Sequence, residues 1–126
     1  MKNLKVTEWV LRLAVAGEFL GHGVFALQGK ESWIPYFTSV GFTAETAAAL
    51  LPLIGYMDIA LAILVLVRPV NIALLWMAFW GFMTALIRPI AGEPIWDFVE
   101  RFANIGATLA LLTLLGWPKT LKGWFR

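Results

Sequence analysis

The segment TAETAAALLPLIGYMDIALAILVLV, residues 43–67, decides the fold of this chain. Apart from Glu45 near its start and Asp58 in its middle, the segment carries no charged side chain. It exceeds the ~20 apolar residues that cross ~30 Å of hydrocarbon as an α-helix. A helix satisfies its backbone hydrogen bonds in lipid, and the run lacks the strict alternation typical of barrel strands. The segment therefore predicts a membrane-spanning helix, with Thr43 as its N-cap and Pro52 tolerated inside it.

Three further apolar segments resemble this one in length. The sequence predicts helices over about residues 6–28, 43–67, 70–90 and 95–116. The chain is 60% hydrophobic and 14% charged, whereas a soluble domain carries about 25% charged residues. Its mean hydropathy is +0.78. We therefore expect one all-α domain over residues 1–126, a polytopic membrane four-helix bundle in contact with the lipid bilayer.

The composition excludes several classes of function. The chain has no cysteine, so it holds no disulfide framework, thiolate metal site or CxxC redox centre. His22 is the only histidine, and we expect neither a bis-histidine haem nor a metal site. The net charge of +2 and the lack of a basic run argue against nucleic acid as a partner. Glu8 and Arg12 interrupt the first apolar segment, which we interpret as a retained span rather than a secretory signal.

Basic residues are distributed unevenly over the two ends of the expected helices. Lys30 and Arg88 flank one side of the four-span arrangement. The other side is flanked by Lys2, Lys5, Arg68, Lys119, Lys122 and Arg126. Because cytoplasmic loops carry the excess of Lys and Arg, we expect both termini in the cytoplasm.

Ionisable side chains also lie inside the apolar segments, where each costs at least ~2.5 kcal/mol and is usually paired or functional. Counting ~1.5 Å per residue from the midpoint of each segment places Arg12 in the inner half and Asp58 near the centre. We expect these two side chains to form a buried, structural ion pair. Breaking such a pair typically costs ~3–5 kcal/mol, so it would fix how the first two helices meet.

A second polar group is expected in the outer half of the bundle. Glu18 and His22 lie one turn apart on the first helix, and the fourth helix carries a polar stripe. The depth count places at a similar level Glu18, His22, Glu100, Arg101 and Asn104, with Arg88 near the outer boundary. Two interpretations stay open: the cluster is a ligand site, or it is a polar lock that holds the helices together.

Aromatic residues suggest two further contacts. Residues 31–42 are rich in aromatic side chains and predict a short element at the membrane surface, either an interfacial anchor or a cover over the outer mouth of the bundle. Trp76 and Trp80 lie mid-span on one helix face, at i and i+4. That face is the candidate docking surface for a partner.

Glycines in the first helix indicate close packing. Gly21 and Gly23 leave the backbone beside His22 bare, which permits either close helix approach or room for a ligand ring. Gly17 and Gly21 also give a small-xxx-small spacing, which predicts a packing contact.

Several short motifs resemble the DoxX family of small four-helix membrane proteins. The matching motifs are LRL at residues 11–13, HG at 22–23, VGF at 40–42 and YMDIA at 56–60. A short arginine-containing turn then leads into the third helix, and the similarity covers roughly residues 11–112. The family usually has glutamate at the position of Asp58, and residues 97–101 are richer in charge than its fourth helix.

The resemblance implies association with membrane redox systems, as subunits linked to quinol oxidation, thiosulfate–quinone chemistry or oxidative stress. We therefore expect a multi-pass protein of a bacterial inner or plasma membrane, present as a homo-oligomer or as a subunit of a membrane oxidoreductase complex. No covalently bound cofactor is expected, and a quinone is the expected ligand. The sequence does not decide whether the chain is itself an enzyme.

The expected function is an accessory subunit of a redox system, with a site for a quinone or another small ligand in the outer half. In that site His22 and Arg101 would donate hydrogen bonds, Glu18 and Glu100 would exchange protons, and Asn104 would orient them. The alternative is a non-catalytic structural or assembly subunit, whose polar cluster locks helix packing and which docks a partner. A small proton-coupled transporter is disfavoured because the sequence has no duplicated half.

Overall fold

All regular structure in residues 3–126, the part of the chain that the computed structural model describes, is helical. The elements are α1 (Leu4–Leu27), the 3-10 helix η1 (Glu31–Trp33), α2 (Ile34–Thr38), α3 (Ala44–Val67), α4 (Asn71–Ile90), α5 (Trp96–Val99), α6 (Phe102–Leu115) and α7 (Leu121–Trp124). The predicted all-α class is confirmed. Lys2, which contributes to the expected orientation, lies outside the described residues.

Four stretches of helix are long and apolar enough to cross a membrane, as expected for a multi-pass membrane protein. They are α1, α3, α4 and the stretch Trp96–Leu115 that contains α5 and α6. Their ends lie within about two residues of the predicted ones, which is the usual uncertainty of helix boundaries. The side chain of Thr43 caps α3 as predicted, because its Oγ1 accepts a hydrogen bond from the N–H of Thr46 at 3.1 Å.

The fourth span is broken at Glu100 and Arg101, so the continuous polar stripe predicted there is wrong. The N–H of Arg101 donates to the carbonyl of Phe98 at 3.1 Å, a bond to the third preceding residue rather than the fourth. Such a turn changes the direction in which the following side chains point. At this break the side chain of Glu100 is 64% exposed, whereas that of Arg101 is 26% exposed.

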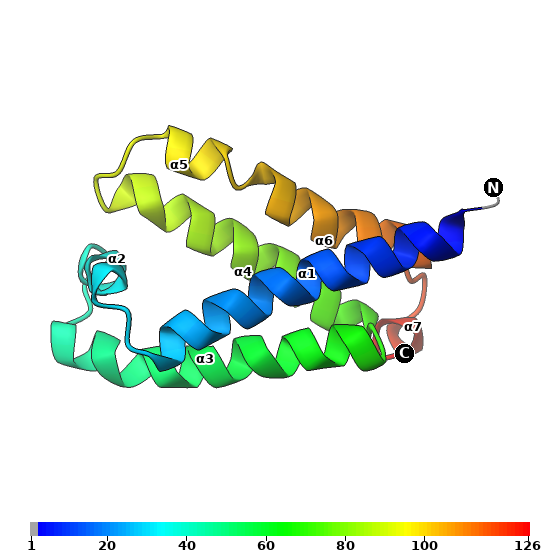
Figure 1. Cartoon of the computed structure of the whole chain (residues 1–126), viewed down its shortest axis with the longest axis horizontal. Coiled ribbons are helices and arrows are strands. Elements are labelled where there is room, and N and C mark those ends of the chain that lie inside the picture. Colours follow the sequence, from blue (N-terminus) through cyan, green and yellow to red (C-terminus); the bar gives the residue numbers. More distant parts are fainter. Residues whose placement is uncertain (1–2) are drawn as a thin grey trace.

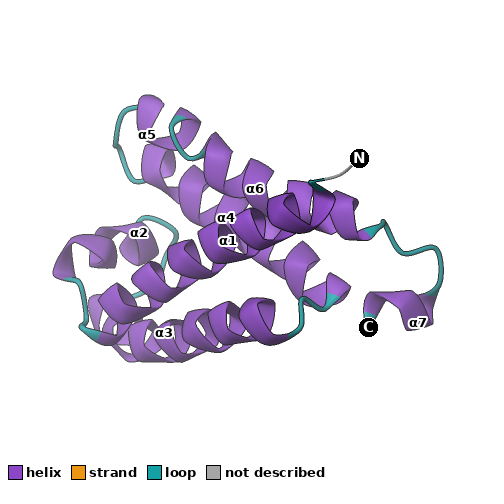
Figure 2. Ribbon diagram, turned by 45° about the vertical axis from the view of Figure 1, so that its right-hand side comes forward, coloured by secondary structure: helices purple, strands orange, loops and turns teal. Residues whose placement is uncertain are grey.

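The long helices pack as two pairs. Helix α1 lies along α3, α4 lies along α6, and contacts between α1 and α6 join the pairs. Helices α3 and α4 are connected by a short turn and diverge away from it, and α2 lies between their far ends (Figure 1 and Figure 2). The beginning of α1 and the whole of α7 lie at the end of the molecule opposite α2.

Helices α1 and α3 come into backbone contact where Gly23 faces Gly55. A Cβ atom on Gly23 would lie 2.9 Å from the carbonyl oxygen of Gly55, and one on Gly55 would lie 2.8 Å from that of Gly23. Real Cβ atoms do not approach so closely, so only glycine fits at either position. The same contact brings Asp58 against α1, because its Cβ lies 3.2 Å from the Cβ position of Gly23. Of the two roles expected for Gly23, the structure selects close helix approach.

The small-xxx-small contact predicted for Gly17 and Gly21 is wrong within this chain. Both glycines are exposed on α1, and a Cβ atom on either would meet nothing within 4 Å. The spacing does define one helix face, but that face points away from α3 and α6.

The apolar core fills the end of the molecule that holds α7. Its fully buried members come from α1, α3, α4 and α6, and they are Val15, Ala16, Phe19, Ala62, Val65, Leu74, Met77, Leu111 and Leu112. All four spans converge on this cluster. The opposite end, where α3 and α4 diverge, lacks such a core and contains the cavity described below.

Arg12 does not pair with Asp58, so the predicted inner ion pair is wrong. Its guanidinium pairs instead with Glu8, one turn earlier on α1, at 3.0 Å. Its Nε and Nη2 donate to the carbonyl oxygens of Val65 and Leu66 at 2.9 and 2.5 Å. These carbonyls lie in the last turn of α3, where no following N–H of the helix is available to donate to them. Arg12 therefore caps the C-terminus of α3, where its positive charge also interacts favourably with the negative end of the helix dipole.

The Gly23 contact predicts unequal effects of two alanine substitutions on α1. We expect Gly23→Ala to lower the free energy of unfolding by about 1–3 kcal/mol, because the new methyl group overlaps the backbone of α3. Gly21→Ala should be neutral or stabilising, because alanine exceeds glycine in helix propensity by ~1 kcal/mol and nothing obstructs it. Thermal unfolding of both variants in the same detergent tests this. Equal effects would show that Gly23 and Gly55 do not set the distance between the helices.

The Arg12 cap predicts a second effect on stability. Arg12→Leu should lower the free energy of unfolding by about 3–5 kcal/mol, because it removes the partner of the partly buried Glu8 carboxylate and of the carbonyls of Val65 and Leu66. Arg68→Leu is the matched control, since Arg68 is exposed at the same end of α3. Thermal unfolding again provides the measurement, and a cost no larger than that of the control would contradict the capping role.

Candidate functional site

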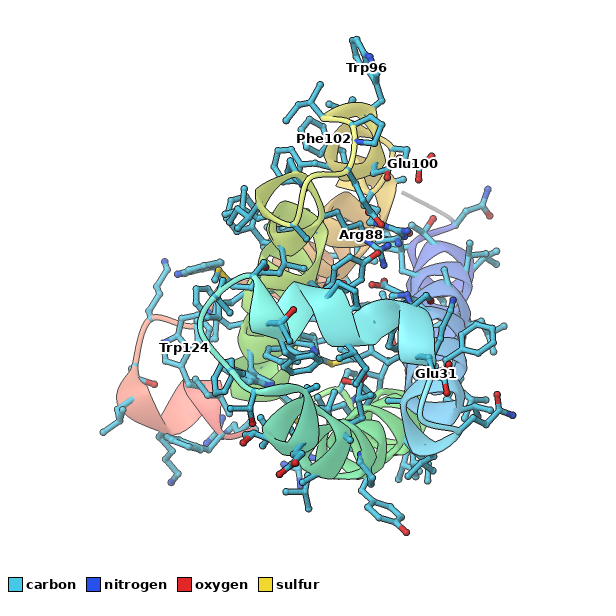
Figure 3. All side chains as sticks on the ribbon, turned by 90° about the vertical axis from the view of Figure 1, so that its left-hand side faces the viewer. Glu31, Arg88, Trp96, Glu100, Phe102 and Trp124 are labelled. Carbon is cyan, nitrogen blue, oxygen red and sulfur yellow. The ribbon has the colours of Figure 1, made fainter. Side chains whose placement is uncertain are left out.

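A cavity of about 310 Å³ lies between α1, α3 and α4 at the end where α3 and α4 diverge. The segment between α1 and α3, which contains α2, covers it. Figure 3, viewed toward this end, shows α2 lying across the molecule with Arg88 beside it. The cavity exists because the two helices separate there and the apolar core fills only the other end.

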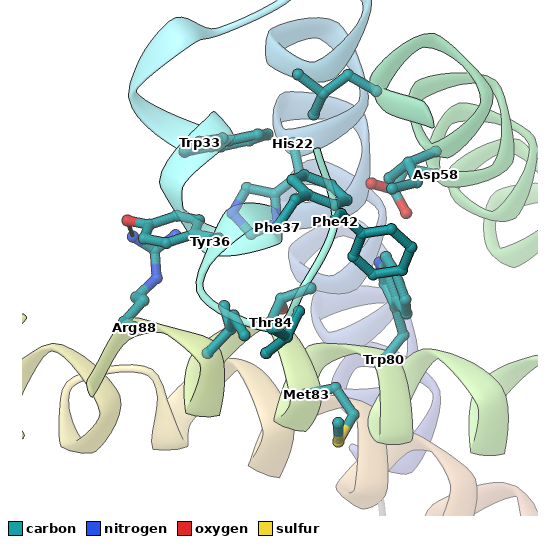
Figure 4. Close-up of a pocket in the computed structure, with 14 residues that line it drawn as sticks. His22, Trp33, Tyr36, Phe37, Phe42, Asp58, Trp80, Met83, Thr84 and Arg88 are labelled. Atoms are coloured by element: carbon teal, nitrogen blue, oxygen red, sulfur yellow. Dashed lines mark hydrogen bonds between the residues drawn. The ribbon is translucent and has the colours of Figure 1, made fainter. Parts of the chain in front are cut away.

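Aromatic side chains form a large part of the cavity wall. Trp33, Tyr36, Phe37 and Phe42 reach it from the covering segment, and Trp80 reaches it from α4 (Figure 4). Of the two interpretations of residues 31–42, the structure therefore selects a cover over the bundle. The covering residues follow one another closely in sequence because a short helix and its flanking turns present several side chains to the same space.

A three-residue network, which we call the Tyr36 clasp, fastens this cover to α4. Tyr36 Oη accepts a hydrogen bond from Arg88 Nη1 at 2.7 Å and donates one to Glu93 Oε1 at 2.8 Å. Glu93 lies in the turn after α4, and its Oε2 is 3.9 Å from Arg88 Nη1. Burial and the hydrogen bond to Glu93 raise the pKa of the Tyr36 phenol above its ordinary value of 10.0. The phenol is therefore neutral and able to donate throughout the physiological range, and the clasp would be lost only at alkaline pH.

The clasp does not use His22 or Asp58, two polar side chains that line the cavity, and the hydroxyl of Thr84 donates to a carbonyl within α4. His22 of α1 packs edge-on against Trp33, with ring centroids 5.9 Å apart. Asp58 of α3 is 3% exposed, and its Oδ1 has no hydrogen-bond partner within residues 3–126. Figure 4 shows the Asp58 carboxylate directed from α3 into the space that His22 and Trp80 also border. Hydrogen bonding between one lining side chain and another is confined to Tyr36 and Arg88.

The structure brings together three members of the cluster predicted from the sequence. Glu18 is half-buried and reaches α4, where its Oε2 is 3.8 Å from the Cβ position of Gly81. The positive charge of Arg101 acts on both Glu18 and His22. Of the three, His22 lines the cavity, whereas Glu18 and Arg101 lie outside its wall.

Two other members of that cluster lie away from the cavity. Glu100 is exposed at the break between α5 and α6, with an oxygen 4.0 Å from Arg101 Nη2. Asn104 is partly buried on α6, where its carbonyl accepts a hydrogen bond from Thr108 at 3.2 Å. Neither residue lines the cavity, because α6 packs behind α4 and α1 and forms none of its walls.

The two tryptophans of α4 differ in exposure. Their rings are stacked, 5.7 Å apart and inclined by 21°. Trp80 is half-buried and lines the cavity, whereas Trp76 is 41% exposed. The structure places Trp80 in the cavity wall, and docking of a partner at Trp76 and Trp80 stays a prediction.

Sequence reasoning missed the contribution of Tyr36, Glu93 and Thr84 to this site. Arg88 was expected only at its boundary. Two signals point to the clasp: an arginine and a glutamate flank the turn after α4, and a tyrosine is present in an aromatic segment. Their pairing spans 57 residues between Tyr36 and Glu93, and no local pattern specifies such a distance.

The arrangement suits a small, mostly apolar molecule. Ligand sites are typically apolar cavities of roughly 300–1,000 Å³ with a few polar groups that fix orientation. This cavity is at the lower end of that range, which fits one substituted ring. Within residues 3–126, no three His, Asp or Glu side chains gather as the ligands of a metal ion would.

Comparisons with protein-family models, curated proteins and solved structures found no match for this chain. The resemblance to the DoxX family therefore stays a prediction from short motifs.

The clasp predicts a local change in dynamics when the Tyr36 hydroxyl is removed. In Tyr36→Phe, we expect the backbone amides of residues 33–41 to exchange hydrogen at least about tenfold faster, because hydrogen bonds to charged groups contribute ~1.5–3 kcal/mol. The matched control is Tyr56→Phe, since Tyr56 is 66% exposed on α3. Hydrogen exchange followed by mass spectrometry measures both. Unchanged exchange in Tyr36→Phe would mean that aromatic packing alone holds the cover.

Proposed function

We propose that this protein binds a quinone-type ring in the cavity beneath α2 and serves as an accessory subunit of a membrane redox system. The observation that carries the proposal is a cavity with aromatic side chains in its wall, where Asp58 Oδ1 is buried without a hydrogen-bond partner and His22 borders the same space. A quinone has a planar ring that packs against aromatic faces, and two oxygen atoms that need polar partners.

The shape of the cavity supports a ring as the ligand. Trp80, Phe37 and Phe42 provide flat apolar surfaces, and His22 borders the same space (Figure 4). An imidazole is suited to donate a hydrogen bond to a carbonyl oxygen. The volume of about 310 Å³ accommodates a head group, and any long tail would extend outside.

The cavity is accessible from its surroundings. Val40, Phe42 and Met83 line it and yet are 51%, 46% and 41% exposed. Met83 belongs to α4, a membrane-spanning helix, so part of the opening lies at membrane depth. A lipid-soluble ligand would reach the cavity there without passing through the apolar core.

The redox role rests on the resemblance to the DoxX family, which implies subunits linked to quinol oxidation. In the proposed orientation the cavity faces the outer side of a bacterial inner or plasma membrane. The support is that basic residues belong to the opposite end, where the positive-inside rule predicts the cytoplasm. Lys5 lies in the first turn of α1, Arg68 directly after α3 and Lys119 shortly before α7. A partner oxidoreductase or further copies of the chain would complete the assembly.

A second candidate is a structural or assembly subunit, as expected from the same polar residues. Two observations favour it. Arg12 and the Tyr36 clasp use their charges to hold helices and the cover in place, and Trp76 leaves an exposed aromatic face. This candidate predicts that substitutions in the cavity change stability or complex yield without changing the binding of any ring compound.

Filling the cavity tests the proposed function. In Ile54→Trp we expect binding of a short-chain benzoquinone to weaken at least about tenfold, because a second indole would occupy the site of the ring. Leu53→Trp is the matched control: it adds the same side chain to the neighbouring residue, which is 65% exposed. Titration of the protein in lipid nanodiscs measures both affinities.

Removing the imidazole tests its expected contact with the ligand. His22→Phe should weaken quinone binding about tenfold, the effect of one hydrogen bond of ~1–1.5 kcal/mol. Glu100→Gln should leave it unchanged, since Glu100 is exposed outside the cavity. If wild-type protein binds no quinone, or if neither cavity variant weakens binding, the proposed function is wrong.

A further inference from the structure

Asp58 is a buried acid without a partner. It is 3% exposed, its Oδ1 forms no hydrogen bond within residues 3–126, and it lines the cavity. Buried polar groups in native proteins are nearly always hydrogen-bonded, because an unsatisfied one costs ~1–3 kcal/mol. A buried polar group that lacks a hydrogen bond and faces a cavity therefore indicates that a molecule bound in the cavity completes the hydrogen bond.

No basic side chain of the described chain compensates Asp58. Arg12, the partner expected from the sequence, is held by Glu8 and by the last carbonyls of α3. Glu18 of α1, which interacts electrostatically with Asp58, is an acid as well and supplies no compensating positive charge. Arg101, which directly precedes α6, acts on Glu18 and not on Asp58. While it is ionised, the carboxyl group of Asp58 accepts hydrogen bonds and donates none, so the partner that completes its bonding must bring a hydrogen atom.

The other polar side chains of the wall have the opposite character. His22 and Arg88 are able to donate hydrogen bonds to a ligand, whereas Tyr36 already donates its single O–H to Glu93. Asp58 is the carboxylate of the described lining. A ligand that satisfies this wall accepts a hydrogen bond at one end and donates one at the other. A quinone only accepts, whereas its reduced form also carries hydroxyl groups that donate.

The surrounding charges favour a neutral donor over a cation. Arg88 brings a positive charge to the same cavity wall as Asp58. A ligand ammonium group in the cavity would be repelled by that charge. A neutral hydroxyl group is not repelled in this way, and it forms a strong, charge-assisted hydrogen bond to a carboxylate.

We propose that Asp58 makes the cavity selective for the hydroxyl-bearing, reduced form of the ring, whose O–H donates to the Asp58 carboxylate. This inference rests on the proposed function, since it assumes that a quinone-type ring occupies the cavity. The oxidised ring would instead place a carbonyl oxygen against a carboxylate oxygen, two acceptors with no hydrogen atom between them. The wall would then hold the hydroquinone more tightly than the quinone.

Three ring compounds of the same shape test the selectivity. They are tetramethylhydroquinone, its dimethyl ether and tetramethylbenzoquinone, titrated without oxygen into the 126-residue chain in nanodiscs. We expect the hydroquinone to bind wild-type protein at least about tenfold more tightly than the other two, because only it donates to a charged acceptor.

Asp58→Leu should abolish this preference and leave the protein as stable as the wild type or more so. Removing an unpartnered buried carboxylate removes a cost, and leucine is tolerated among apolar neighbours. Quinone affinity should stay the same or rise, because the opposing acceptor is gone. Asp58→Asn retains the shape of the side chain, and its neutral amide oxygen should leave a reduced preference of about threefold.

Glu18→Gln is the matched control, because Glu18 is an acid near Asp58 that does not line the cavity. The control should keep the full preference. A lower melting temperature for Asp58→Leu, together with an unchanged preference, would identify Asp58 as a structural residue and overturn the inference.

Other outcomes separate the inference from the proposed function. Binding of hydroquinone and quinone with equal affinity, or tighter binding of the quinone, overturns the inference alone. Tighter binding of benzylammonium than of the hydroquinone would show that Asp58 receives a cation, which also overturns it. If none of the three ring compounds binds wild-type protein, the proposed function fails and this inference fails with it.

Discussion

The backbone contact between Gly23 and Gly55 is the constraint on which the rest of the structure depends. A Cβ atom on either glycine would lie 2.8–2.9 Å from the carbonyl oxygen of the other, so α1 and α3 are closer together than ordinary side chains allow. The contact fixes the register of the two helices and brings Asp58 against α1. It also keeps α3 with α1 rather than with α4, and the space between α3 and α4 becomes the cavity.

The ionisable side chains then divide into two groups with different physical roles. Arg12 and Arg88 are engaged by carboxylates and by carbonyl or hydroxyl oxygens, and they fasten the end of α3 and the cover over the cavity. Asp58 and His22 face the cavity without comparable partners. A membrane protein keeps buried charge either where it stabilises the fold or where a ligand uses it. The two groups illustrate both cases in one small chain.

Several features could be predicted from local sequence because their causes are local. Thr43 caps α3 because its hydroxyl is one turn from an unpaired N–H, and hydropathy alone gives the helix ends within about two residues.

The pairing of Arg12 could not be predicted in the same way. Aligning helix midpoints sets Arg12 opposite the region of Asp58, whereas the glycine contact shifts α3 by about one and a half turns and sets Arg12 opposite Val65.

The sequence by itself determined the number of membrane-spanning helices, their ends, and which polar residues lie within them. Apolar length and backbone hydrogen bonding in lipid are properties of each segment alone. Only the tertiary structure decided which of those polar residues meet. It excluded Glu100 and Asn104 from the cavity, turned Trp80 into it, and joined Tyr36 to Arg88 and Glu93. These outcomes depend on the rotation and register of whole helices, which close packing between distant segments sets and no single segment encodes.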